Sequence, residues 1–172
     1  MHGPSSSERG AAAGALATAA RYIAVSVAGS LYGLSVDDVQ EVIGMRPVTR
    51  LFHAPPAIRG VTNLRGEVLP VLDLAVLLGA TTSDTEAHDP RIVVVRESSG
   101  ARRRAGLSVD ALRGLREVPE SGLIAAPSTL GELAREIVGG VIATPPPCTV
   151  LNVSAILDSP LLSRFAGGES TG

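Results

Sequence analysis

The five residues GLSVD stand at positions 33–37 and again at positions 106–110 of the 172-residue chain. In both places the pentapeptide follows an apolar segment and a turn signal, so it is predicted to be the second strand of a β-hairpin. Other segments agree in the same order, namely 58–61 with 137–141 and 71–74 with 150–153. The repetition predicts two related halves within one β-rich domain.

The first half opens with a strand and continues past the first pentapeptide. Apolar residues alternate with smaller ones over residues 23–27, a period of two that is typical of a half-buried strand. After the pentapeptide, Asp37 and Gln40 have the spacing of a capping box, which predicts a helical turn over residues 37–42. Residues 45–52 are expected to be extended.

The segment 58–74 carries the densest signals in the chain. It predicts a strand, a tight turn around Arg65 and Gly66, and a second strand. Pro70 has no N–H to donate to a neighbouring strand, so it is expected at a sheet edge or beside a bulge.

A short helix is predicted at the end of each half. In the first half it covers residues 74–78, with Asp73 as its N-cap and Gly79 as its end. In the second half Asn152 stands where Asp73 does, and asparagine has the same capping chemistry.

The second half repeats the plan. Residues 92–95 form an uninterrupted apolar run, which predicts a strand buried on both faces. Residues 104–109 are predicted to be its hairpin partner. Asp110 again stands where the strand is expected to give way to a short helical turn.

Composition divides the chain into segments. Residues 1–20 are rich in alanine and read as a flexible leader, residues 80–90 as a polar connector, and residues 159–172 as a C-terminal tail. Many short strands with turn signals at this spacing favour a barrel or a sandwich. We assign one half of the fold to residues 21–80 and the other to residues 91–158.

The composition also excludes several classes of protein. All 15 basic residues are arginines, and a Walker-type phosphate loop and a Schiff-base enzyme both require lysine. Aromatic residues make up only 2%, which disfavours surfaces that stack bases or sugars. The basic run at 102–104 follows a turn signal and is interpreted as a hairpin end, so no nucleic-acid partner is predicted.

Residues with reactive side chains are scattered. His2, His53 and His88 do not have the spacing of a metal site or a catalytic triad. Cys148 is the single cysteine, which is consistent with a reducing cytoplasm. Asp73 interrupts the longest apolar run, so no membrane span is predicted. We therefore predict no catalytic residue, no metal and no cofactor.

One difference between the halves points to a functional surface. The first half has residues 63–66 in its turn, where the second has the three prolines 145–147. Glu41 also stands where the second half has Gly114. Arg65 in the turn and Glu41 could form a charge-assisted pair, or both could be unrelated solvated charges. The pattern alone leaves the two interpretations evenly weighted.

These residues resemble a known family. Residues 60–74 read GVTNLRGEVLPVLDL and are preceded by VQEV at 39–42 and VTR at 48–50. The set is similar to the CheW family of chemotaxis coupling proteins, over about residues 21–157. The resemblance implies one CheW-like domain, 21–158, with a mainly β fold of two small five-stranded SH3-like β-barrel subdomains packed together, with short helices.

The resemblance also implies a function without chemistry. Family members are adaptors in a two-component signalling pathway. They join the regulatory domain of a CheA-like histidine kinase to the cytoplasmic tip of chemoreceptors. A chain of this kind is expected in the cytoplasm, recruited to receptor arrays without entering the membrane. The alternative is a diverged member that binds only the kinase in a dedicated motility or chemosensory pathway.

Seven positions carry over from the family as partner-binding residues. They comprise the glutamate–arginine pair, two contact positions on the predicted elements around it, and the rest of the turn. In this sequence they are Val39, Glu41, Gly60, Asn63, Leu64, Arg65 and Gly66.

Overall fold

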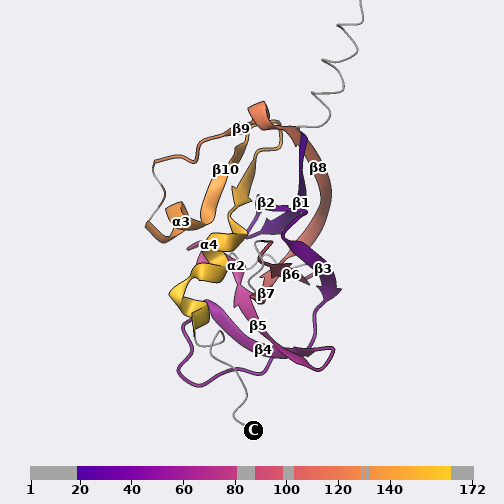
Figure 1. Cartoon of the computed structure of the whole chain (residues 1–172), viewed down its shortest axis with the longest axis vertical. Coiled ribbons are helices and arrows are strands. Elements are labelled where there is room, and N and C mark those ends of the chain that lie inside the picture. Colours follow the sequence, from indigo (N-terminus) through magenta and orange to yellow (C-terminus); the bar gives the residue numbers. More distant parts are fainter. Residues whose placement is uncertain (1–18, 81–87, 99–102, 129, 131, 164–172) are drawn as a thin grey trace, which may run out of the picture.

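A computed structural model describes the whole chain except residues 1–18, 81–87, 99–102, 129, 131 and 164–172. The described residues form two β-sheets with short helices between and beside them (Figure 1). Sheet A contains, in spatial order, β8 (Ala111–Pro119), β1 (Ala19–Val27), β2 (Ser30–Ser35), β11 (Cys148–Leu151), β10 (Val138–Ile142) and β9 (Leu123–Ile124). Sheet B contains β3 (Val39–Gly44), β6 (Arg91–Arg96), β7 (Arg104–Val109), β5 (Glu67–Asp73) and β4 (Ile58–Leu64). The helical elements are α2 (Leu74–Leu77), η1 (Glu120–Gly122), α3 (Glu132–Ile137), α4 (Val153–Asp158) and η2 (Pro160–Leu162).

Each sheet takes strands from both halves of the chain. Sheet A combines β1 and β2 with β8 to β11, and sheet B combines β3 to β5 with β6 and β7. Our assignment of one barrel to residues 21–80 and the other to 91–158 is therefore wrong in its strand content. Repeats in the sequence show which strands are equivalent, but they do not show which half supplies the neighbour of each strand.

Two parallel strand pairs join strands from different halves of the chain. Val71 of β5 pairs with Gly106 of β7, and Val150 of β11 pairs with Gly33 of β2. Gly33 and Gly106 are the first residues of the two pentapeptides, and residues 71–74 and 150–153 are the segments matched to each other in the sequence. The two halves are therefore related by a pseudo-twofold, and each sheet pairs the opening hairpin of one half, β1–β2 or β6–β7, with several strands of the other half.

The helical turns predicted after the two pentapeptides do not form as predicted. Residues 36–38 make only a short turn, and residues 39–44 and 111–119 are strands. β3 pairs with β6 and β8 pairs with β1, and each has a bulge at the same place, Gln40 in β3 and Arg113 in β8. The Asp110 carboxylate accepts the N–H of Ala28 at 2.8 Å instead of capping a helix. Pairing with a distant strand outweighs the local capping signal, because it satisfies a row of backbone groups at once.

The predicted caps of the two short helices are confirmed. Asp73 Oδ1 accepts the N–H of Val76 at 3.2 Å, and α2 ends at Leu77, one residue before the predicted end. Asn152 Oδ1 accepts the N–H of Ala155 at 3.1 Å at the start of α4. The exchange of aspartate for asparagine thus leaves the cap geometry unchanged.

Apolar side chains form one shared core and one smaller cluster under each sheet. The shared core joins the sheets and α2 and α4, with Val25 and Leu34 from sheet A and Val93 and Leu107 from sheet B. The cluster of sheet A contains Tyr22, Val118, Ile142, Cys148 and Val150. The cluster of sheet B contains Leu64, Leu69, Val71, Ile92 and Val94.

The limits and irregular parts of the fold differ in detail from the predictions. Residues 45–52 form no strand and are tied to β4 by a bridge between Thr49 and Val61, beside which Thr62 Oγ1 donates to the carbonyl of Pro47 at 2.9 Å. Leu162 is 6% exposed and belongs to the shared core, so the fold includes η2, which we had assigned to the tail. Pro70 pairs with β4, whereas the pairing of β5 with β7 starts at Val71. β5 is an inner strand of sheet B, so the predicted edge position is wrong, but Pro70 itself lies beyond the ladder with β7 and has a strand neighbour on one side only.

Replacing Val94 by aspartate is expected to unfold the domain. Val94 is 0% exposed in β6, so the carboxylate would lie unpaired in the cluster of sheet B. We expect the loss of at least about 4 kcal/mol of the free energy of unfolding, measured by urea denaturation. Val68→Asp is the matched control, because Val68 lies in the same sheet and is 68% exposed. A folded Val94→Asp protein of unchanged stability would show that the core assignment is wrong.

Candidate partner-binding site

The turn between β4 and β5 has a strained but well-supported backbone. Arg65 and Gly66 have φ angles of 52° and 85°, so both central residues are left-handed, as in a type I′ hairpin turn. Asn63 Oδ1 accepts the N–H of Gly66 at 2.9 Å and closes the turn from inside. A left-handed arginine is unfavourable relative to glycine, so this turn keeps a charged side chain at a conformational cost.

Arg65 and Glu41 form the pair that the sequence left undecided. Arg65 Nη1 donates to Glu41 Oε1 at 2.6 Å, and Nη2 donates to Oε2 at 2.8 Å. This two-pronged geometry is the strongest that an arginine makes with a carboxylate. Glu41 lies on β3, at one edge of sheet B, and the turn belongs to the β4–β5 hairpin, which forms the other edge. We call the pair the Glu41–Arg65 clamp, because it ties the two edges of the sheet together.

The clamp shifts the pKa of both partners so that each charged form is favoured. The hydrogen bonds from Arg65 lower the pKa of Glu41, and the positive charges of Arg65, Arg46 and Arg104 act in the same direction. The carboxylate in turn raises the pKa of Arg65. The Arg65 side chain is nevertheless 71% exposed. The clamp thus holds in place a cation that remains available at the surface.

Further polar contacts hold the same turn. Arg46 Nη1 donates to the carbonyl of Asn63 at 3.1 Å, and Arg104 forms an ion pair with Glu67 at the start of β5. Sequence reasoning did not find Arg46, Arg104 or Glu67. The arginines lie far from the turn in sequence, so no local pattern could have indicated these contacts.

A groove runs beside the turn. It is lined by residues of the loop after β3 and of the β4–β5 hairpin, including Arg46, Thr49, Val61, Asn63 and Val68. Val68 is 68% exposed, which is unusual for a valine in a strand. The groove therefore combines an apolar wall with cationic and amide groups, the kind of surface that recognises a protein partner.

The structure brings together only part of the predicted set. Glu41, Asn63, Arg65 and Gly66 meet at the turn. Leu64, in contrast, is 3% exposed and packs in the cluster of sheet B.

Val39 and Gly60 also have structural roles. Val39 is partly buried against the shared core. Gly60 has a φ of 144°, and a side-chain carbon there would lie 2.1 Å from the carbonyl oxygen of Thr49. Both positions therefore shape the sheet that carries the turn.

The geometry agrees with comparisons to known proteins. The sequence profile of the CheW-like domain matches residues 21–161 of this chain. The chain belongs to the CheW-like family. The resemblance seen in the motifs and the mainly β fold class are thereby both confirmed, since a solved CheW structure has the same fold; sheet A, however, has six strands where five were expected. That structure, the scaffolding protein TtCheW from Thermoanaerobacter tengcongensis, superimposes with a TM-score of 0.70 at 28% identity, covering 78% of this chain and 84% of TtCheW.

Curated relatives carry chemotaxis names. The probable chemotaxis protein CheW of Rhizobium etli is 31% identical over 121 residues, covering 70% of this CheW-like chain and 76% of the relative. The protein FrzA of Myxococcus xanthus is 37% identical over 111 residues, covering 64% of this chain and 66% of FrzA. Across the described parts of the chain, no helix is long and apolar enough to cross a bilayer.

The clamp predicts an acid-shifted titration of Glu41. Because its pKa is lowered in the folded state, the clamp stabilises the fold above the ordinary glutamate pKa of about 4.3, and this stabilisation is lost as pH falls through the lowered value. We expect NMR titration of the Glu41 carboxyl carbon to give a midpoint below 4.3 in this CheW-like protein. Arg65→Gln should raise that midpoint, whereas Arg91→Gln on β6 should leave it unchanged. Equal midpoints in all three proteins would contradict the clamp.

Proposed function

We propose that this CheW-like chain is a non-catalytic adaptor that joins chemoreceptors to a CheA-like histidine kinase in a chemotaxis-type signalling pathway. Family membership supports a scaffolding role in chemotaxis, since relatives are named chemotaxis proteins and a structural neighbour is named a scaffolding protein. The regulatory domain of the kinase and the cytoplasmic tip of the receptor are the proposed partners. The chain would then act in the cytoplasm at receptor arrays, held there by protein contacts.

The Glu41–Arg65 clamp is the observation that carries this proposal. It holds a turn rigid while leaving the arginine 71% exposed beside a groove with an exposed valine. Pre-ordering a surface before binding reduces the entropy that association costs. The equivalent turn of sheet A contains Pro145 to Pro147 in place of these polar groups, so the scaffold alone does not require them.

The seven predicted residues have different roles in the proposed binding. We infer that Asn63, Arg65 and Gly66 contact the partner directly, because the turn that they form is exposed. Glu41 holds Arg65 in place. Val39, Gly60 and Leu64 act by shaping the sheet beneath.

Reversing the charge at the turn is expected to weaken kinase binding. Arg65→Glu places two carboxylates together and releases the turn, so its affinity for the kinase regulatory domain should fall at least about tenfold in calorimetry. Restoring the pair in the double variant Glu41→Arg with Arg65→Glu should recover part of the lost affinity. Arg91→Glu is the matched control, since it reverses a partly exposed arginine that is paired with Asp89 at 2.9 Å.

Titrations with each partner separately test the function itself. Binding to both the regulatory domain and a receptor-tip fragment is expected. Binding to the kinase alone would support the alternative of a diverged, single-partner member. Binding to neither, or an affinity that Arg65→Glu leaves unchanged with an unchanged melting temperature, would contradict the proposal.

A further inference from the structure

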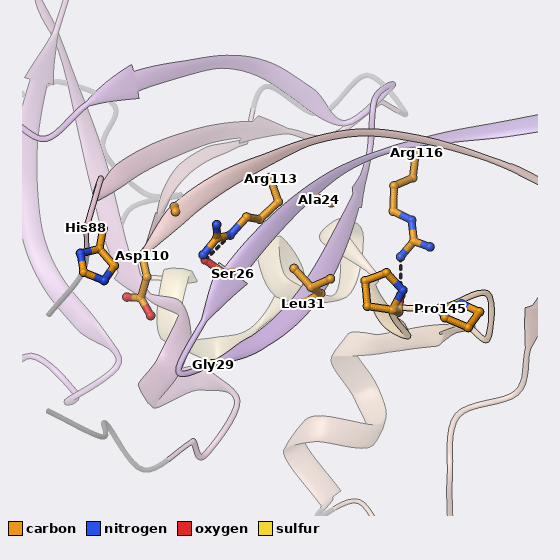
Figure 2. Close-up of a pocket in the computed structure, with 11 residues that line it drawn as sticks. Ala24, Ser26, Gly29, Leu31, His88, Asp110, Arg113, Arg116 and Pro145 are labelled. Carbon is orange, nitrogen blue, oxygen red and sulfur yellow. Dashed lines mark hydrogen bonds between the residues drawn. The ribbon is translucent and has the colours of Figure 1, made fainter. Parts of the chain in front are cut away.

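A cleft opens on sheet A, away from the Glu41–Arg65 clamp on sheet B. Its volume is about 670 Å³, and its walls come from the β1–β2 hairpin, β8 and the proline turn between β10 and β11. Figure 2 shows Ala24 and Leu31 at its centre, Arg113 and Arg116 on either side of them, and Pro145 closing one end. We call it the proline-turn cleft.

The pseudo-twofold relation identifies the matching place on sheet B. A side-chain carbon on Gly33 would touch Tyr22, Cys148 and Val150. One on Gly106 would touch Ile92, Leu69 and Val71. The clusters of the two sheets are therefore equivalent, residue by residue, around the two pentapeptide glycines.

Strand pairing extends this equivalence to the cleft. Ala24 pairs with Gly33 and also with Gly114, and Val94 pairs with Gly106 and also with Glu41. Ala24 is thus the counterpart of Val94. Two residues further along the edge strands, Arg116 of β8 is the counterpart of Ile43 of β3.

Sheet B fills the space that sheet A leaves open. In sheet B, Val94, Leu64 and the partly buried Ile43 pack together in one cluster. In sheet A the corresponding strand positions hold Ala24 and Arg116, and the corresponding turn is the exposed proline turn. A smaller side chain and a polar one replace apolar bulk, so the end of the sheet A cluster is hollow. The cleft is therefore a property of these residues and not of the scaffold.

The cleft has an apolar floor and a cationic rim. Arg116 donates to the carbonyls of Thr144 at 2.9 Å and of Pro146 at 2.7 Å, which fixes its charge beside the proline turn. Arg113 Nε donates to Ser26 Oγ at 3.2 Å. Within the described residues the terminal amino groups of Arg113 make no further hydrogen bond, so they can donate to an acceptor on a ligand.

Among the described residues that line the cleft, Asp110 is the single acidic one, and it is already engaged. The Asp110 carboxylate accepts the N–H of Ala28 at 2.8 Å and holds the β1–β2 hairpin. Asp110 is thus committed to the backbone. The rim carries two arginines, Arg113 and Arg116, and one aspartate. These three side chains together have a net positive charge.

We propose that the proline-turn cleft binds a small carboxylate that carries a short aliphatic chain. The aliphatic part would lie on Leu31 and against Pro145, above Ala24, which is only 2% exposed, where it takes the place of the apolar side chains that fill sheet B. The carboxylate would accept from Arg113, whose planar guanidinium matches it, in the field of Arg116. A volume of about 670 Å³ lies within the usual range for small-molecule sites. This inference does not depend on the proposed adaptor function.

Hexanoate is the probe for this site. In methyl NMR titrations of the full chain, hexanoate should shift the Ala24 and Leu31 methyl signals in a saturable way. Acetate lacks the chain and 1-hexanol lacks the charge, so both should bind at least about tenfold more weakly. N-acetyl-leucine carries the same pair of groups as a peptide C-terminus. Tighter binding of hexanoate than of N-acetyl-leucine would indicate a free acid, and the reverse order a protein C-terminus.

Two variants test the cleft by independent routes. Arg113→Gln should weaken hexanoate binding about tenfold, because it removes a charge-assisted hydrogen bond. Arg50→Gln, an exposed arginine in the loop after β3, is its control and should bind like the original chain. Ala24→Val restores the bulk of Val94 and should abolish binding with the melting temperature kept or raised. Hexanoate shifts that are absent, or unchanged by Arg113→Gln, would overturn the proposal even if Ala24→Val failed to fold.

Discussion

The fold depends on the parallel pairing of strands that come from different halves of the chain. β5 completes sheet B by pairing with β7, and β11 completes sheet A by pairing with β2. The shared core then buries Val25 and Leu34 of one sheet against Val93 and Leu107 of the other. Because neither half contains all the strands of a sheet, neither can bury its own apolar surface. The two halves are therefore one cooperative unit despite their repeated sequence.

The two sheets connect an edge strand to a hairpin turn through different hydrogen bonds. In each sheet an edge strand is tied to a hairpin turn on the other side of the sheet. In sheet B, Glu41 on the strand receives Arg65 from the turn, and in sheet A, Arg116 on the strand donates to the turn carbonyls of Thr144 and Pro146. The first solution leaves a charged side chain exposed, whereas the second leaves a cationic cleft. Divergence between equivalent positions thus produced two different surfaces on one scaffold.

Much of the site and part of the fold followed from the sequence, for physical reasons. The turn at Arg65, the two helix caps and the buried strand at Val94 depend on local conformation and apolar pattern, which a sequence displays directly. The helical turn after Asp37 was wrong because cross-strand pairing prevailed over a local cap. The pairing of strands from different halves and the contact of Arg46 with the turn depend on distant partners. No periodic pattern in a sequence indicates such contacts between distant residues.

The pairing of strands from different halves also has a consequence for synthesis of the protein on the ribosome. β2 and β5 emerge early, but their parallel partners, β11 and β7, belong to the later half of the chain. Until those partners are made, each early strand has an open edge that any other nascent strand could pair with. Sheet A stays incomplete until Cys148–Leu151 has emerged, almost at the end of the described fold. The order of translation thus leaves the nascent chain open to mispairing, a cost of its interlocked halves.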